Sequence, residues 1–167
     1  ADLTLRDLWI YTYPTQEELN RAGITGLFLG YFVPWDGWHN ALIAQARGFE
    51  TYPHLVEGSL ANYENLDNAQ TGIHDYFKYL KFAFGRATDI ASLLIRRGWL
   101  SRSRAMSLVW KMDGRFPGNY LSYSLDAILA HIGMARDAFD LICDRFTNRA
   151  LFQTDTQGDL IRRADGS

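Results

Sequence analysis

The chain has 167 residues, of which 47% are hydrophobic and 22% are charged, a composition typical of a globular protein with a packed core. Its formal net charge of -2 excludes an overall basic field that would favour nucleic acid, although local basic patches stay open. The one cysteine, Cys143, excludes an internal disulfide and a multi-cysteine zinc site, so we expect it to fill core space in a reducing cytosol. No apolar run approaches the roughly 20 residues of a membrane-spanning helix, so no membrane span is predicted.

The first 60 residues predict the end of an α/β domain, made of a late strand and a helix. Thr15 to Glu18 has the Thr-x-x-Glu form of a capping box, which starts a short helix that ends near Gly23. The run GITGLFLGYFV, 23–33, predicts a buried strand of a mostly parallel sheet, and a helix follows over 40–47. We interpret both ends of the chain as cuts through a longer protein, so the neighbours of the predicted strand are expected upstream. Without these neighbours, the isolated chain should expose apolar surface along residues 26–33.

Residues 61–150 predict a helical region, and 151–167 predict a truncated, hairpin-like tail around Gln157 and Gly158. The first helix begins near residue 71, and Thr88 or Asp89 is expected to cap the second. Apolar spacing predicts the core faces, which consist of Ile73, Phe77, Leu80 and Phe84, then Ile90, Leu93 and Leu94, then Ala105, Leu108, Val109 and Met112, then Leu125, Ile128, Leu129 and Ile132, then Ala135, Phe139, Ile142 and Phe146.

A second stripe on the first of these helices suggests an anion-binding surface. His74, Lys78 and Lys81 recur at spacings of four and three, about a quarter-turn from the core stripe. Arg86 follows beside Gly85, where a glycine lets the backbone approach a ligand closely or take a positive φ. These cations could receive a phosphate or a sugar carboxylate, and the alternative is a solvated helix face.

Two further groups of residues could line a ligand, and each has a structural alternative. Glu64, Asn65 and Asp67 lie in a predicted loop, where they could recognise sugar hydroxyls or magnesium, or could cap helices and turns. Trp35 and Asp36 follow the predicted strand, at the end of an α/β sheet where ligands usually bind, and the tryptophan could equally belong to the core. The scattered histidines predict no metal site, and no phosphate-binding loop motif is present.

One segment resembles a known family. Residues 74–114, HDYFKYLKFAFGRATDIASLLIRRGWLSRSRAMSLVWKMDG, resemble the C-terminal region of the N-acetyl sugar amidotransferases of bacterial surface-polysaccharide and lipopolysaccharide (LPS) O-antigen biosynthesis. GRATD is its most specific part. The resemblance covers about residues 20–150 and extends through GLFLGYFVPWDG, ENLDNAQTGIHDYF and IGMARDAFDLICDRFTN.

The resemblance implies a PP-loop ATP pyrophosphatase fold, similar to the adenine nucleotide α-hydrolases, followed by a helical extension. It implies a cytoplasmic enzyme that uses ATP and Mg²⁺ to adenylylate a sugar-linked carboxylate, and a glutaminase subunit that supplies the ammonia. The SGGxDS-like ATP loop is missing from this sequence, so we expect the chain alone to be inactive. The fold expected for the chain is mainly α with a small α/β N-terminal part.

Acyl adenylylation requires a carboxylate and a phosphate to be held together with their repulsion neutralised. We therefore expect Lys78, Lys81 and Arg86 to neutralise substrate or pyrophosphate charge, with His74 and Asp89 orienting them. The alternative is a helical module that binds a protein partner or RNA through its basic helix, although the net charge of -2 argues against RNA. The sugar, the glutaminase and any homo-oligomer are left open.

Overall fold

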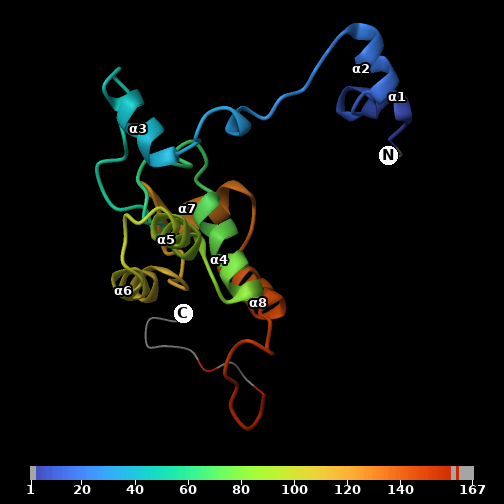
Figure 1. The fold of residues 1–167 in the computed structure, drawn as a ribbon. Coiled ribbons are helices and arrows are strands. Elements are labelled where there is room, and N and C mark those ends of the chain that lie inside the picture. The colour runs from blue at the N-terminus through green and yellow to red at the C-terminus, as the bar shows by residue number, and fades with distance from the viewer. Residues whose placement is uncertain (1–2, 159–160, 162–167) are drawn as a thin grey trace. The chain divides into compact units, whose positions relative to one another are not determined.

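The computed structural model describes residues 3–158 and 161, and this part of the chain is mainly helical (Figure 1). It contains eight α-helices, two short 3-10 helices and one two-stranded sheet within the described residues. The chain divides into two compact units, Ala1–Ala46 and Arg47–Ser167, and each is described by itself.

The first unit consists of short helices. In chain order they are α1 (Leu5–Leu8), η1 (Trp9–Tyr11), α2 (Gln16–Ala22), η2 (Leu29–Tyr31) and α3 (Gly37–Gln45). The predicted capping box at the start of α2 is confirmed, because Thr15 accepts from the Glu18 N–H while the Glu18 carboxylate accepts from the Thr15 N–H at 2.8 Å. Gly23 ends the helix in the left-handed conformation, with φ 67°.

The prediction of a strand over residues 23–33 is wrong. The segment instead has irregular backbone followed by η2, and the sheet within the described residues lies elsewhere. A strand needs a neighbour to satisfy its backbone groups, and no other segment of the described chain pairs with this one. Its apolar side chains are exposed, Phe28 by 81% and Tyr31 by 86%, as expected for 26–33. The small α/β part of the predicted fold class is therefore not formed in the described residues.

The second unit contains the longer helices. They are α4 (Thr71–Phe82), α5 (Arg86–Arg96), α6 (Arg102–Met112), α7 (Leu125–His131) and α8 (Arg136–Phe146), with strands β1 (Asn119–Tyr120) and β2 (Tyr123–Ser124) between α6 and α7. The two strands form an antiparallel hairpin in which Tyr120 pairs with Tyr123. Apolar spacing along the sequence predicted all five of these helices.

The main core lies where α4 packs against α7 and α8. It consists of Tyr76, Leu80, Leu125, Leu129, Phe139 and Cys143. Phe77 and Phe139 meet edge to face with their ring centres 6.0 Å apart, which confirms that these helices share their apolar faces. The core position predicted for Cys143 is also confirmed. Phe84 is not part of this stripe, because α4 ends at Phe82 and Ala83 turns the chain with φ 58°.

A second apolar cluster holds the irregular segment 47–70 on the helices. Val56, Tyr120 and Ile128 are its buried members, and Tyr52 and Leu66 pack against them. In the tail, a turn over 155–158 brings the Ile161 N–H to the Gln153 carbonyl oxygen at 3.0 Å. The rest of the predicted hairpin, 159–160 and 162–167, lies outside the described residues.

Candidate functional site

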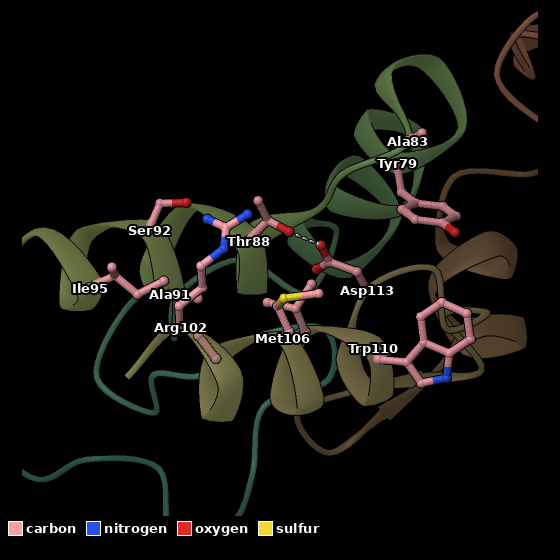
Figure 2. A pocket seen from close by; sticks show the side chains of 12 residues that line it. Tyr79, Ala83, Thr88, Ala91, Ser92, Ile95, Arg102, Met106, Trp110 and Asp113 are labelled. Atoms are coloured by element: carbon pink, nitrogen blue, oxygen red, sulfur yellow. Dashed lines mark hydrogen bonds between the residues drawn. The ribbon is translucent and has the colours of Figure 1, made fainter. Parts of the chain in front are cut away.

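The junction of α4 and α5 is held by a carboxylate from the far end of α6. Asp113, which is buried, accepts hydrogen bonds from the Gly85 N–H at 2.8 Å, the Ala87 N–H at 3.1 Å and the Thr88 hydroxyl at 2.6 Å. Figure 2 shows the bond between Asp113 and Thr88. This carboxylate caps the N-terminus of α5 from another element. The prediction that Thr88 or Asp89 caps α5 is wrong, because the helix begins at Arg86 and both residues lie in its first turn.

Two glycines allow the close packing of this junction. A Cβ atom on Gly85 would lie 2.6 Å from the Asp113 carboxylate, and one on Gly114 would lie 2.5 Å from the Tyr79 ring. Gly114 also has φ +77°, which side chains rarely tolerate. Gly85 has φ -113°, so the positive φ offered as one reason for this glycine is not adopted, and its close neighbour in the structure is the Asp113 carboxylate of the protein itself.

Arg86 links α5 to α4 and to the loop before it. Its Nε donates to Asp75 at 2.9 Å, and its Nη1 donates to Glu64 at 3.5 Å. Burial lowers the pKa of Arg86, but the hydrogen bond and charge of Asp75, with the charge of Glu64, outweigh burial and raise the pKa above its ordinary value. Arg86 is therefore a fixed cation that already has two carboxylate partners.

Tyr120 closes the same network from the hairpin. Its side chain is buried, and its hydroxyl donates to the Asn65 carbonyl oxygen at 3.2 Å. Burial and the nearby charge of Asp75 raise the pKa of Tyr120 above its ordinary value. Glu64 and Asn65, predicted as ligand-lining, thus belong to a network that joins the loop to α4, α5 and β1, while Asp67 is exposed.

The predicted cationic stripe lies on one side of α4. Lys78 forms an ion pair with Asp89 of α5 and lies over the Phe84 ring, 4.6 Å from its centre. Lys81 lies over the Phe146 ring at 4.7 Å and has no carboxylate partner among the described residues. His74 is 76% exposed, with Nδ1 3.2 Å from the buried Asp75 carboxylate.

The residues predicted to bind substrate fall into separate pairs in the structure, Lys78 with Asp89 and Arg86 with Asp75 and Glu64, so most of the predicted positive charge already has a carboxylate partner. Lys78 and Arg86 are paired with carboxylates, whereas the Lys81 ammonium has no carboxylate partner among the described residues. Trp35 and Asp36 belong to the first unit. There Asp36 caps α3 by accepting from the His39 N–H at 2.8 Å, and α3 consequently begins at Gly37, ahead of the predicted start at residue 40.

A cavity of about 380 Å³ lies between α5 and α6, and the sequence did not predict it (Figure 2). Its lining consists of Tyr79, Ala83, Thr88, Ala91, Ser92, Ile95, Arg102, Ala105, Met106, Val109, Trp110 and Asp113. Figure 2 shows the Arg102 side chain extending from α6 toward α5. The lining combines apolar side chains with the hydroxyls of Tyr79, Thr88 and Ser92, the Arg102 guanidinium and the Asp113 carboxylate, so the cavity presents one group of each charge beside apolar walls. The small side chains of Ala91 and Ala105 are a sequence signal for close packing between α5 and α6. The cavity beside them depends on the angle at which the two helices pack, which the sequence does not show.

The described residues contain neither a candidate membrane-spanning helix nor a candidate metal site. No helix of 3–158 is long and apolar enough to cross a membrane. The same part of the chain contains no group of three or more His, Cys, Asp or Glu side chains placed to hold a metal ion.

Comparison with protein families gives a match over most of the chain. No curated protein matches the sequence. Residues 49–164 match the family described as LPS biosynthesis protein WbpG-like, C-terminal domain, and this range contains α4 to α8 with the α4–α5 junction and the α5–α6 cavity. The match confirms the resemblance to the C-terminal region of LPS biosynthesis proteins. The chain belongs to the WbpG-like C-terminal domain family of LPS biosynthesis proteins.

Proposed function

We propose that this chain is the C-terminal, substrate-side region of an ATP-dependent N-acetyl sugar amidotransferase with a PP-loop fold. The observation that carries the proposal is the family match over residues 49–164, which assigns the helical unit to LPS biosynthesis. In this proposal the whole protein works in the cytoplasm, activates a carboxylate on an N-acetyl sugar with ATP and Mg²⁺, and receives ammonia from a glutaminase subunit.

The residues of this chain do not fit a complete site for ATP or Mg²⁺. The sequence has no phosphate-binding loop, and the described residues hold no carboxylate cluster for a metal ion. We therefore derive no nucleotide step from this chain. Its contribution to the proposed reaction is to bind the sugar and to keep its negative groups neutralised.

Lys81 and Lys78 are the residues proposed to bind the anionic groups of the sugar. Lys81 is exposed and has no carboxylate partner in the described chain. Lys78 is paired with Asp89, whose side chain is 50% exposed, and such half-exposed pairs contribute little stability and exchange readily. A substrate carboxylate or phosphate can therefore replace the Asp89 carboxylate on Lys78, with His74 one turn away on the same face.

Arg86 has a positioning role in this proposal. Its two carboxylate partners hold it at the start of α5, where it fixes the junction that sets Asp89 against Lys78. It therefore acts on the substrate through the placement of α5.

The test is an amidation assay of the full-length protein with ATP, ammonium and a carboxylated N-acetyl sugar. The chain has three lysines, so Lys111→Ala on α6 is a matched control for Lys78→Ala and Lys81→Ala. Loss of one charge-assisted contact should lower kcat/KM about 10- to 100-fold in K81A, and K111A should keep wild-type values. Wild-type activity in both K78A and K81A would remove the site assignment, and no amidated product from the wild-type protein would contradict the function.

A further inference from the structure

The cavity between α5 and α6 follows the length of α6. Arg102, Met106 and Trp110 are spaced by four residues, so their side chains succeed one another along one side of the helix, and all three line the cavity. The helical rise separates Arg102 from Trp110 by about 12 Å along the axis. In Figure 2 Met106 lies between these two residues. The cavity therefore has the shape to hold an elongated ligand, with Arg102 at one end and Trp110 at the other.

The Arg102 end of the cavity has a positive charge that the protein does not pair. The Arg102 guanidinium has no carboxylate partner in the described part of the chain, whereas Arg86 and Arg136 each contact two carboxylates. Ser92 lies on α5, toward which Arg102 extends in Figure 2, and its hydroxyl forms no hydrogen bond within the described residues. A guanidinium and a hydroxyl with free donors can together bind the oxygens of one carboxylate.

The other charged group of the cavity, the Asp113 carboxylate, is already satisfied. One of its oxygens accepts from the Gly85 N–H and the Thr88 hydroxyl, and the other accepts from the Ala87 N–H. A ligand cation would have to compete with this cap, and a second anionic group beside Asp113 would be repelled by it. The ligand that fits both charges has one negative group, placed at Arg102, and an uncharged body.

The body of the ligand would lie against apolar walls. Between its two ends the cavity is lined by alanine, isoleucine, methionine and valine side chains, and the rings of Tyr79 and Trp110 lie beyond them. Its volume of about 380 Å³ lies within the range of small-molecule sites. These walls favour methylene groups over a hydroxylated ring, because most hydroxyls placed against them would lose their hydrogen bonds to water.

We propose that the α5–α6 cavity binds an aliphatic carboxylate of medium chain length. The carboxylate contacts the Arg102 guanidinium and the Ser92 hydroxyl, and the chain runs past Met106 toward Trp110. This site is separate from the cationic stripe, because neither Lys78 nor Lys81 is among the lining residues. The proposal goes beyond the proposed amidation and does not depend on it.

The test is calorimetric titration of the full chain with octanoate. We expect one octanoate to bind for each chain, about tenfold more tightly than hexanoate, because each buried methylene contributes up to about fourfold. Three further probes separate the parts of the ligand. Acetate has the charge without the chain, 1-octanol has the chain without the charge, and glucuronate carries its carboxylate on a hydroxylated ring. Each should bind at least about tenfold more weakly than octanoate.

The variants test the position of the carboxylate. Arg102→Gln should weaken octanoate binding about tenfold or more and leave 1-octanol binding unchanged. The matched control is Arg104→Gln, an exposed arginine of the same helix that does not line the cavity. Met106→Glu places a carboxylate one turn from Arg102, where it should pair with the guanidinium and weaken octanoate binding by a similar factor. Its control, Met106→Leu, should keep wild-type affinity.

Four results would overturn the proposal. The first is the absence of octanoate binding by a wild-type chain with native helix content in circular dichroism. The second is an equal loss in R102Q and R104Q, or 1-octanol binding as tight as that of octanoate, since either would indicate unspecific association with exposed apolar surface. The third is glucuronate binding as tight as octanoate binding, which would indicate a sugar site. The fourth is an octanoate affinity that falls as protein concentration rises, which would show that a second copy fills the cavity.

Discussion

The carboxylate of Asp113 accepts a hydrogen bond from the backbone N–H of Gly85 at 2.8 Å, although 28 positions separate the two residues in the sequence. Through this contact the end of α6 fixes the beginning of α5. The first turn of α5 carries both Arg86 and Asp89, so Asp113 controls where the ion pairs with Asp75 and Lys78 form. The geometry of the proposed substrate site therefore depends on a residue that does not touch it.

Asp113→Asn should destabilise the protein by about 2–3 kcal/mol. The amide cannot accept all three of the hydrogen bonds that cap α5, and a buried donor then loses its partner. Urea unfolding measures the loss. Asp126→Asn is the control, because its exposed ion pair with Arg136 should contribute less than about 1 kcal/mol. Equal urea midpoints for D113N and D126N would contradict the capping role.

Gly114→Ala should destabilise the protein more than Gly98→Ala. Both glycines have positive φ, +77° and +73°, so an alanine costs about 1 kcal/mol of backbone strain at each. At Gly98 the new Cβ meets no atom within 4 Å, whereas at Gly114 it would lie 2.5 Å from the Tyr79 ring. This clash should add roughly 1–3 kcal/mol to the loss of stability in the Gly114 variant. Thermal melting of the two variants gives the comparison, and similar melting temperatures would mean that Tyr79 moves away without cost.

Arg86→Met should cost about 3 kcal/mol, because it leaves the buried Asp75 carboxylate without its ion-pair partner. The double variant R86M with Asp75→Asn removes the uncompensated charge and should regain part of that loss. A double-mutant cycle measured by urea unfolding isolates the coupling between the two residues. Additive effects of the two substitutions would show that the pair does not stabilise the junction.

Stability should fall at alkaline pH in a way that depends on Tyr120. Burial raises the pKa of Tyr120 in the folded state, so folding favours the neutral phenol. That contribution is complete below the ordinary tyrosine pKa of about 10 and is lost as pH rises from there through the higher folded-state pKa. Tyr120→Phe should be about 1 kcal/mol less stable than wild type at pH 7, because the hydrogen bond to Asn65 is lost. The difference should shrink above pH 10 when unfolding is followed at several pH values. A difference that stays constant to pH 11 would contradict this assignment.

Local sequence signals predicted the helices of the second unit well. The apolar spacing of Leu125, Ile128 and Leu129 is the buried face of α7, and Phe139 lies in the core as its position predicts. The capping box at Thr15 is also confirmed, because its bonds connect residues three apart. The prediction of a strand over 23–33 is wrong because a strand, unlike a helix cap, depends on a second segment of chain that pairs with it. An apolar run alone does not supply that second segment.

The sequence predicts which residues share the stripe on α4, but it does not predict the partners of their charges. The spacing of His74, Lys78 and Lys81 gave the stripe on α4, which the helix confirms. The contact of Lys78 with Asp89 crosses the break between two helices, and its geometry depends on the angle between α4 and α5. Asp113 gave no local signal as a cap, since it acts on a helix that begins far from it in the sequence. Tertiary packing decides both features, so a single sequence cannot specify them.

The most direct test of the proposed function is the nucleotide product that the full-length protein releases when it is incubated with ATP, ammonium and a carboxylated N-acetyl sugar. Adenylylation of the carboxylate followed by attack of ammonia predicts one AMP and one pyrophosphate for each amide formed, and no AMP when the sugar is left out. Release of ADP and phosphate, or AMP formation that does not require the sugar, would contradict the account.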